Sequence, residues 1–195
     1  MELSTLGFPA SYSARVLSEP PQQRALLFER PSGGKPRPGI LVWEIPPLPS
    51  LFVEIWTRNG THWIGEFKAG LGGISGIFAT PNEDTMCVIN RGEAYLVDTL
   101  RPERYSLLPA IPVKLIGRVP GRDILFIGDY IELCAVSKDG LVWRTRRVSW
   151  DGIKILEVTD RQIRGEGWDA PTDRWIPFSV DVETGHVEGG PDVPH

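Results

Sequence analysis

Short blocks of apolar residues, separated by polar pairs that end in glycine, recur along the chain. The clearest example is residues 51–67, LFVEIWTRNGTHWIGEF, where two runs rich in aromatic and branched side chains flank Asn59-Gly60. This dipeptide tolerates the positive φ angles of a tight hairpin turn, and such runs are typical of strands. The pattern therefore predicts a β-hairpin that turns at Asn59-Gly60.

The same arrangement of strand, glycine turn and strand occurs three more times, with turns at Arg91-Gly92, around Asp139-Gly140, and at residues 183–185. The uneven spacing of the turn glycines brackets the roughly 40 to 50 residues of one four-stranded propeller blade. No segment offers a helical face of about twelve residues. We expect an all-β fold of about four antiparallel β-sheet units in a small propeller-like arrangement, with a β-sandwich or open barrel as the alternative.

The start of the chain departs from this pattern. Residues 1–24 mix Ser, Pro and Gln with few periodic apolar positions, which predicts a loosely structured N-terminal arm. Residues 25–195 then form a single all-β domain, a size within the usual range for one core. Inside it, residues 29–39 form a Pro/Gly/basic loop ahead of the apolar run at 40–44.

The strand phase also predicts the core, because alternate residues of a strand face opposite sides of its sheet. We expect the following apolar residues to be buried: Val53, Ile55, Ile64, Phe78, Val88, Ile89, Leu96, Ile116, Leu125, Ile127, Leu133, Ala135, Val142 and Phe178.

Composition narrows the class of protein. The chain has 21 glycines and 18 prolines, against about 14 and about 10 at average usage, which suits many short strands and turns. A net charge of −4 disfavours nucleic acid as a partner, because that affinity comes from clustered Lys and Arg. No apolar run is long enough for a membrane-spanning helix and no secretory signal is recognisable, so we expect a cytoplasmic protein with two buried free thiols, Cys87 and Cys134.

Two stretches carry a resemblance to known repeats. ISGIFATPNEDTMCVINRGEAYLVDT resembles a β-propeller blade, and FSVDVETGHVEGG resembles the phrase that ends such blades. The segment from residue 139 to residue 185 is also similar to small bacterial proteins of uncharacterised function. The His and Trp-Asp signatures of the commonest propeller repeat are missing, which puts a regular closed ring in doubt. The resemblance implies a fold and transfers no catalytic or ligand residues.

Seven tryptophans make aromatic chemistry the most prominent feature of the sequence. Most lie within apolar runs and suit core packing, whereas Trp150, Trp168 and Trp175 lie beside charged and turn residues. Arg164 and Asp169 belong to the same C-terminal third. We therefore predict a binding surface around these five residues: Trp150, Arg164, Trp168, Asp169 and Trp175.

Catalytic signatures are weak. Carboxylates at Asp151, Glu166, Asp169 and Asp173 could provide the acid pair of a glycoside hydrolase, although turn formation explains them more simply. The three histidines are scattered and no Cys-x-x-Cys occurs, so we expect no metal, and the absence of a phosphate-binding loop or dinucleotide motif predicts no cofactor.

Arg144, Arg146, Arg147, Arg161 and Arg164 form the one basic concentration. They suit either a solvated edge strand, where charge opposes edge-to-edge pairing, or a contact with an anionic patch on a partner protein.

These features favour a non-catalytic protein-interaction module of scaffold or immunity type, which binds another protein through loops and aromatic edges. The alternative is a carbohydrate-active or other hydrolase that uses the carboxylates of the C-terminal third. A deep pocket into which two of those carboxylates converge would favour the enzyme, and a filled or shallow surface the binder. The sequence does not indicate the partner or the oligomeric state.

Overall fold

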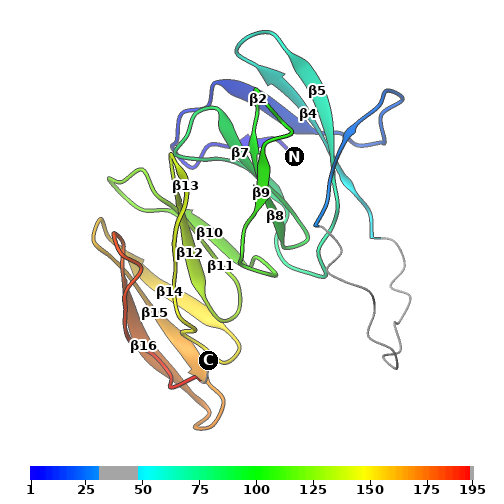
Figure 1. Cartoon of the computed structure of the whole chain (residues 1–195). Coiled ribbons are helices and arrows are strands. Elements are labelled where there is room, and N and C mark those ends of the chain that lie inside the picture. The colour runs from blue at the N-terminus through cyan, green and yellow to red at the C-terminus, as the bar shows by residue number, and fades with distance from the viewer. Residues whose placement is uncertain (31–47, 194–195) are drawn as a thin grey trace.

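The computed structural model describes residues 1–30 and 48–193, and every described element is a β-strand. The strands form four sheets that follow one another along the molecule (Figure 1). This confirms the all-β fold of about four mainly antiparallel sheet units. The loop expected at 29–39 falls almost wholly outside the described residues, and the apolar run at 40–44 falls outside them entirely. In the described part of the chain no helix could span a membrane.

Each sheet is built from strands that are mostly adjacent in sequence, which we name sheets A to D in chain order. Their strand orders and bounds are as follows: sheet A, β2 (Tyr12–Val16), β4 (Leu51–Thr57), β5 (His62–Phe67) and β3 (Leu26–Phe28); sheet B, β1 (Leu3–Ser4), β6 (Gly76–Ala79), β7 (Thr85–Asn90), β8 (Glu93–Asp98) and β9 (Tyr105–Leu107); sheet C, β10 (Leu115–Arg118), β11 (Leu125–Gly128), β12 (Leu133–Ser137) and β13 (Gly140–Arg144); sheet D, β14 (Ile153–Val158), β15 (Gln162–Asp169), β16 (Arg174–Asp181) and β17 (Val187–Gly189).

Three hydrophobic clusters join neighbouring sheets: one lies between A and B, one between B and C, and one between C and D. Strand β7 is almost wholly apolar because both of its faces are buried. Met86 and Val88 face sheet A, while Cys87 and Ile89 face sheet C. In β15, by contrast, buried and more exposed residues alternate. Inner sheets therefore bury both faces, and end sheets bury one.

Three of the four predicted hairpin turns are confirmed, and the fourth is displaced by one residue. Arg91 and Gly92 both adopt positive φ, 48° and 82°, between the paired residues Asn90 and Glu93, as a tight two-residue turn requires. Gly60 and Gly185 also have positive φ. In sheet C the turn residues are Lys138 and Asp139, because Ser137 pairs with Gly140, so the turn lies one position earlier than expected.

The predicted core is largely buried, with one error. Phe78 and Ile116 are half-buried, but Val142 is 50% exposed. The pairing of β12 with β13 slips between Ala135 and Val136, so Val142 is the extra residue of a β-bulge. This one-residue insertion changes the strand phase and places Trp143 in the core instead, at 7% exposure.

The N-terminal segment also differs from the loosely structured arm expected over residues 1–24. Strand β1 pairs in parallel with β6 of sheet B, and β2 forms an edge of sheet A. Between them Phe8 is 3% exposed and packs in the cluster between sheets B and C, where the guanidinium of Arg118 lies 4.4 Å from its ring centre. The segment therefore connects three sheets, because most of its few apolar side chains pack in the hydrophobic clusters between them.

Candidate functional site

The two end sheets each keep one face outside the three hydrophobic clusters, so an exposed binding surface can be built there. On sheet D this outer D face consists of the residues that alternate with its buried ones: Lys154, Leu156, Glu157, Gln162, Arg164, Glu166, Trp168, Trp175, Pro177, Ser179, Asp181 and Glu188. It includes three of the five residues predicted from the sequence: Arg164, Trp168 and Trp175.

Aromatic rings gather at one end of the outer D face. Trp168 and Trp175 are directly opposite across β15 and β16, and their ring centres are 5.4 Å apart. The ammonium of Lys154 lies 3.6 Å from the centre of the Trp175 ring, an arrangement that holds the ring in place through a cation–π contact. Both rings are half-buried, so each keeps area free for a partner.

Trp150 supports this end from the loop that precedes β14. Its backbone N–H donates to the carbonyl oxygen of Trp168 at 2.9 Å. The indole Nε1 of Trp150 is buried and has no hydrogen-bond partner among the residues that the structure describes. The backbone of Trp150 is therefore tied to the strand that carries Trp168.

The middle and far end of the outer D face are hollowed by two adjoining depressions that share Ser179 and Glu188. The first, about 410 Å³, contains the exposed apolar side chains of Leu156 and Pro177 beside Arg164. The second, about 520 Å³, is lined mainly by polar groups. Arg164 donates to Glu157 at 3.0 Å and to Gln162 at 3.3 Å, and its side chain remains more than half exposed on this face.

Asp169 does not share this surface. In the strand register Asp169 lies opposite Arg174, on the same side of the sheet as the buried Gly167. Its side chain is 8% exposed. Its carboxylate accepts a hydrogen bond from the hydroxyl of Thr172, which fixes the turn between β15 and β16. Asp169 therefore has a role in the turn.

The carboxylates of the hydrolase hypothesis are also separated. Glu166 lies on the outer D face, whereas Asp169 lies on the opposite side of the same strand. Asp151 and Asp173 are exposed loop and turn residues, and Asp173 has a positive φ of 56°. None of the four lines either depression on the outer D face.

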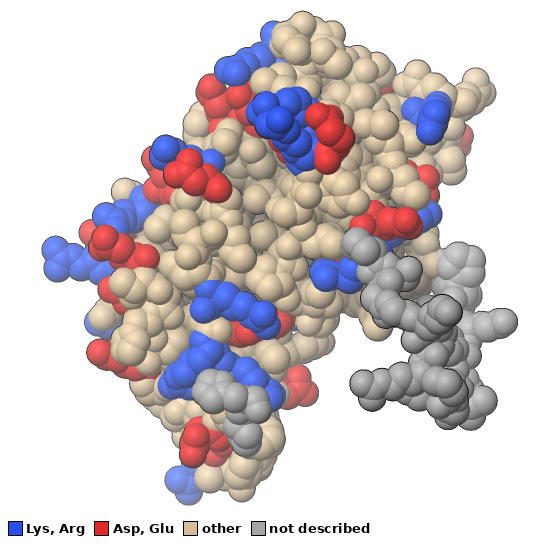
Figure 2. All heavy atoms as spheres, in the orientation of Figure 1, with Lys and Arg blue, Asp and Glu red and all other residues tan. Residues whose placement is uncertain are grey.

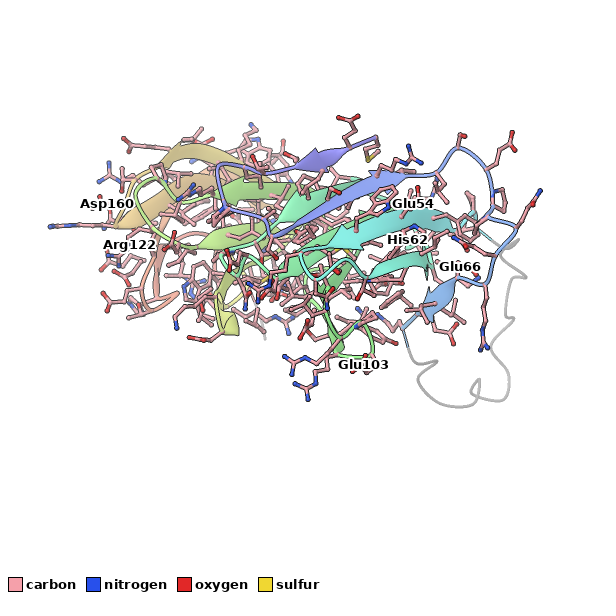
Figure 3. The ribbon with its side chains drawn as sticks, turned by 90° about the horizontal axis from the view of Figure 1, so that it is seen from above. Glu54, His62, Glu66, Glu103, Arg122 and Asp160 are labelled. Carbon is pink, nitrogen blue, oxygen red and sulfur yellow. The ribbon has the colours of Figure 1, made fainter. Side chains whose placement is uncertain are left out.

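Sheet A presents a different outer face, which the sequence did not single out. Glu54 and His62 lie side by side on this face, with 2.9 Å between the carboxylate and the imidazole Nε2 (Figure 3). Glu54 also accepts a hydrogen bond from Arg15 at 2.9 Å, and the Trp56 ring contacts both the guanidinium of Arg15 and the ring of His62. Burial disfavours the charged form of Glu54, but the hydrogen bonds from Arg15 and His62 outweigh it and lower the pKa of the carboxyl. The charges and hydrogen-bonding groups of Arg15, Glu54 and His62 are thus paired with one another, as is typical of a solvated sheet face.

Charge on the molecular surface is mixed. On the side seen in Figure 2, Lys and Arg side chains lie among Asp and Glu, with no large patch of one sign. Arg144 of the basic concentration lies on the edge strand β13 and pairs with Glu132. The hydrogen bond to Glu132 raises the pKa of Arg144. Arg144 therefore has a structural partner next to β12 of its own sheet.

No protein-family model and no curated protein matches the chain. Among solved structures, it resembles a chain in the complex of S. cerevisiae Dbp5 bound to Nup159, Gle1, IP6 and ADP, with 14% identity and a TM-score of 0.41 over 71% of this chain and 37% of that one. A second resemblance is to the N-terminal domain of Nup159, with 14% identity and a TM-score of 0.40 over 71% and 38%. The chain thus spans less than half the length of either.

Proposed function

We propose that this chain is a non-catalytic protein-interaction module of scaffold or immunity type that binds another protein on the outer D face. The observation that carries the proposal is the Trp168–Trp175 pair, held half-exposed on a sheet face that no neighbouring described sheet covers. Trp and Arg dominate the energies of protein interfaces, and Arg164 lies on the same face.

The surface has further properties of a protein-binding site. It combines aromatic rings, exposed aliphatic side chains and an exposed Arg, and its two depressions adjoin at Ser179 and Glu188. A hydrolase would need two carboxylates that converge on one cleft. The placement of Glu166 and Asp169 on opposite faces of β15 supports the binding role over that alternative.

Two further inferences concern the arrangement of the sheets and the cellular location. We infer a propeller-like arrangement, because each sheet is a set of largely sequential strands stacked on the next. We also infer a cytoplasmic location, which the free, buried thiols of Cys87 and Cys134 support since they carry no disulfide.

Co-purification tests the proposal. A tagged chain should capture a partner from extracts of its source cells, and a Trp168→Ala/Trp175→Ala variant should lose that partner. Trp56→Ala is the matched control, because Trp56 is a partly exposed ring on the outer face of sheet A. Loss of the partner in the control but not in the double variant would place the interface on sheet A and overturn the proposal.

A further inference from the structure

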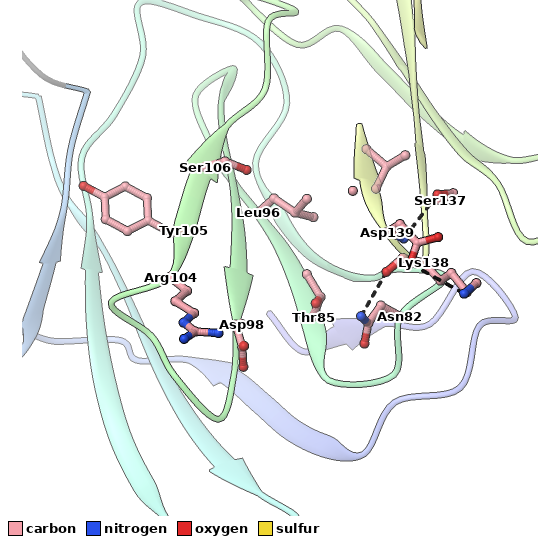
Figure 4. A pocket seen from close by; sticks show the side chains of 12 residues that line it. Asn82, Thr85, Leu96, Asp98, Arg104, Tyr105, Ser106, Ser137, Lys138 and Asp139 are labelled. Carbon is pink, nitrogen blue, oxygen red and sulfur yellow. Dashed lines mark hydrogen bonds and ion pairs between the residues drawn. The ribbon is translucent and has the colours of Figure 1, made fainter. Parts of the chain in front are cut away.

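A separate pocket of about 350 Å³ lies between sheets B and C (Figure 4). Its floor consists of Leu96 and Val136, which belong to the hydrophobic cluster between the two sheets. One wall comes from sheet B and the loop that joins β8 to β9, and the other from the turn between β12 and β13. The volume is within the range of small-molecule sites, so the pocket can hold a small ligand.

The two walls are fixed relative to each other. Asn82, from the loop between β6 and β7, donates from its side-chain amide to the carbonyl oxygen of Lys138 at 3.0 Å. The same Asn82 accepts the backbone N–H of Asp84, so its orientation is set from within sheet B. The turn that carries Lys138 and Asp139 is therefore held in position before any ligand binds.

The walls carry charged groups of opposite sign that are free to bind a ligand. On the sheet B side, Arg104 makes no ion pair within the described residues, because Asp98 is taken by Arg101 at 3.0 Å. On the sheet C side, Asp139 has only Lys138 near it, at 3.5 Å, and both side chains are more than 70% exposed. A pair so exposed contributes little and can be exchanged for a ligand contact.

We infer that this pocket binds a small zwitterion with an apolar body, of the size of a short peptide. Its carboxylate pairs with Arg104 in the fork geometry that guanidinium offers, and its ammonium pairs with Asp139. The apolar side chains of the ligand cover Leu96 and Val136. Because the charged groups come from different sheets, a ligand with a charge at each end satisfies both, whereas a singly charged ligand leaves one without a partner.

NMR titration with leucyl-leucine tests this inference. We expect saturable shifts of the Ser106 and Gly140 amides with a Kd of about 1 mM or lower, given the number of atoms in this ligand. The N-acetylated and C-amidated dipeptides, which each lack one charge, should bind about tenfold more weakly, since each loses a charge-assisted hydrogen bond. Free leucine is included to separate a single amino acid from a peptide.

Single substitutions test which protein residue binds each charged end of the ligand. Arg104→Gln should remove the preference for the free carboxylate, and Asp139→Asn the preference for the free ammonium. Arg122→Gln is the control, because Arg122 is an exposed arginine that does not line the pocket. A well-dispersed spectrum shows that each variant is folded. Equal binding of capped and uncapped dipeptides, or no saturable shift up to about 10 mM, would overturn the inference.

Discussion

The indole Nε1 of Trp143 donates a hydrogen bond to the backbone carbonyl oxygen of Val182 at 2.8 Å, which links sheet C to sheet D. The ring is 7% exposed and packs in the cluster between these sheets. Gly185 makes room for it, because a Cβ at that glycine would lie 2.8 Å from the ring. Among the described residues, sheet C is the sheet that packs against the inner face of sheet D, and this contact depends partly on Trp143.

Replacing Trp143 should separate the value of this hydrogen bond from that of the packing. Trp143→Phe loses the donor and leaves a carbonyl unsatisfied, so we expect a loss of about 1 to 3 kcal/mol in the free energy of unfolding. Trp143→Ala also loses the buried ring and should cost about 3 to 5 kcal/mol. Urea unfolding measures both. Equal losses in the two variants would mean that the ring itself contributes little.

Phe8 should be a stabilising residue, although it lies in a segment of low periodicity. Because it is 3% exposed between sheets B and C, Phe8→Ala should lower the free energy of unfolding by about 3 to 5 kcal/mol. Glu19→Ala, at an exposed position of the same segment, should change it by less than about 0.5 kcal/mol. Similar small effects in urea unfolding would show that the N-terminal segment is not part of the core.

Gly92 and Gly60 have nearly the same φ, 82° and 80°, but different surroundings. A Cβ at Gly60 would meet nothing within 4 Å, whereas one at Gly92 would lie 2.0 Å from the carbonyl oxygen of Gly72. Gly60→Ala should therefore cost about 1 kcal/mol from backbone strain alone. Gly92→Ala should cost clearly more, because backbone must shift, and thermal unfolding of the two variants should rank them in that order.

The thiols of Cys87 and Cys134 should be unreactive in the folded protein. Burial raises the pKa of each to about 12, so the thiolate, which is the reactive form, is scarce at pH 8. A thiol-specific reagent at pH 8 should label both cysteines in about 6 M urea and neither in buffer, as read by mass spectrometry. Rapid labelling without urea would contradict the burial of these side chains.

The sequence predicts sheets and turns better than it predicts faces. Glycine turns such as Arg91-Gly92 depend on local backbone geometry, which nearby residues specify. The bulge at Val142 depends on how β13 pairs with β12, so the apolar pattern alone could not reveal it. The burial of Phe8 could not be predicted from the sequence, because a single buried ring in a polar segment has no periodicity to mark it.

The candidate site, too, could be predicted only in part from the sequence. Trp168, Trp175 and Arg164 could be selected from residue type, and strand alternation places all three on one face. Asp169 could not be separated from them without the strand boundary, because one step along β15 reverses the direction of the side chain. The pocket between sheets B and C joins residues about 35 positions apart, Arg104 and Asp139, which no local pattern connects.

The affinity of the recovered partner for the Trp168→Ala/Trp175→Ala variant tests the interaction proposal most directly. Isothermal titration should show a loss of about 30-fold or more relative to the unmodified chain, since buried Trp side chains at interfaces contribute about 2 kcal/mol or more. The thermal midpoint should fall by less than about 6 °C, because both rings are only half-buried. An unchanged affinity in a folded double variant would contradict a binding role for the outer D face.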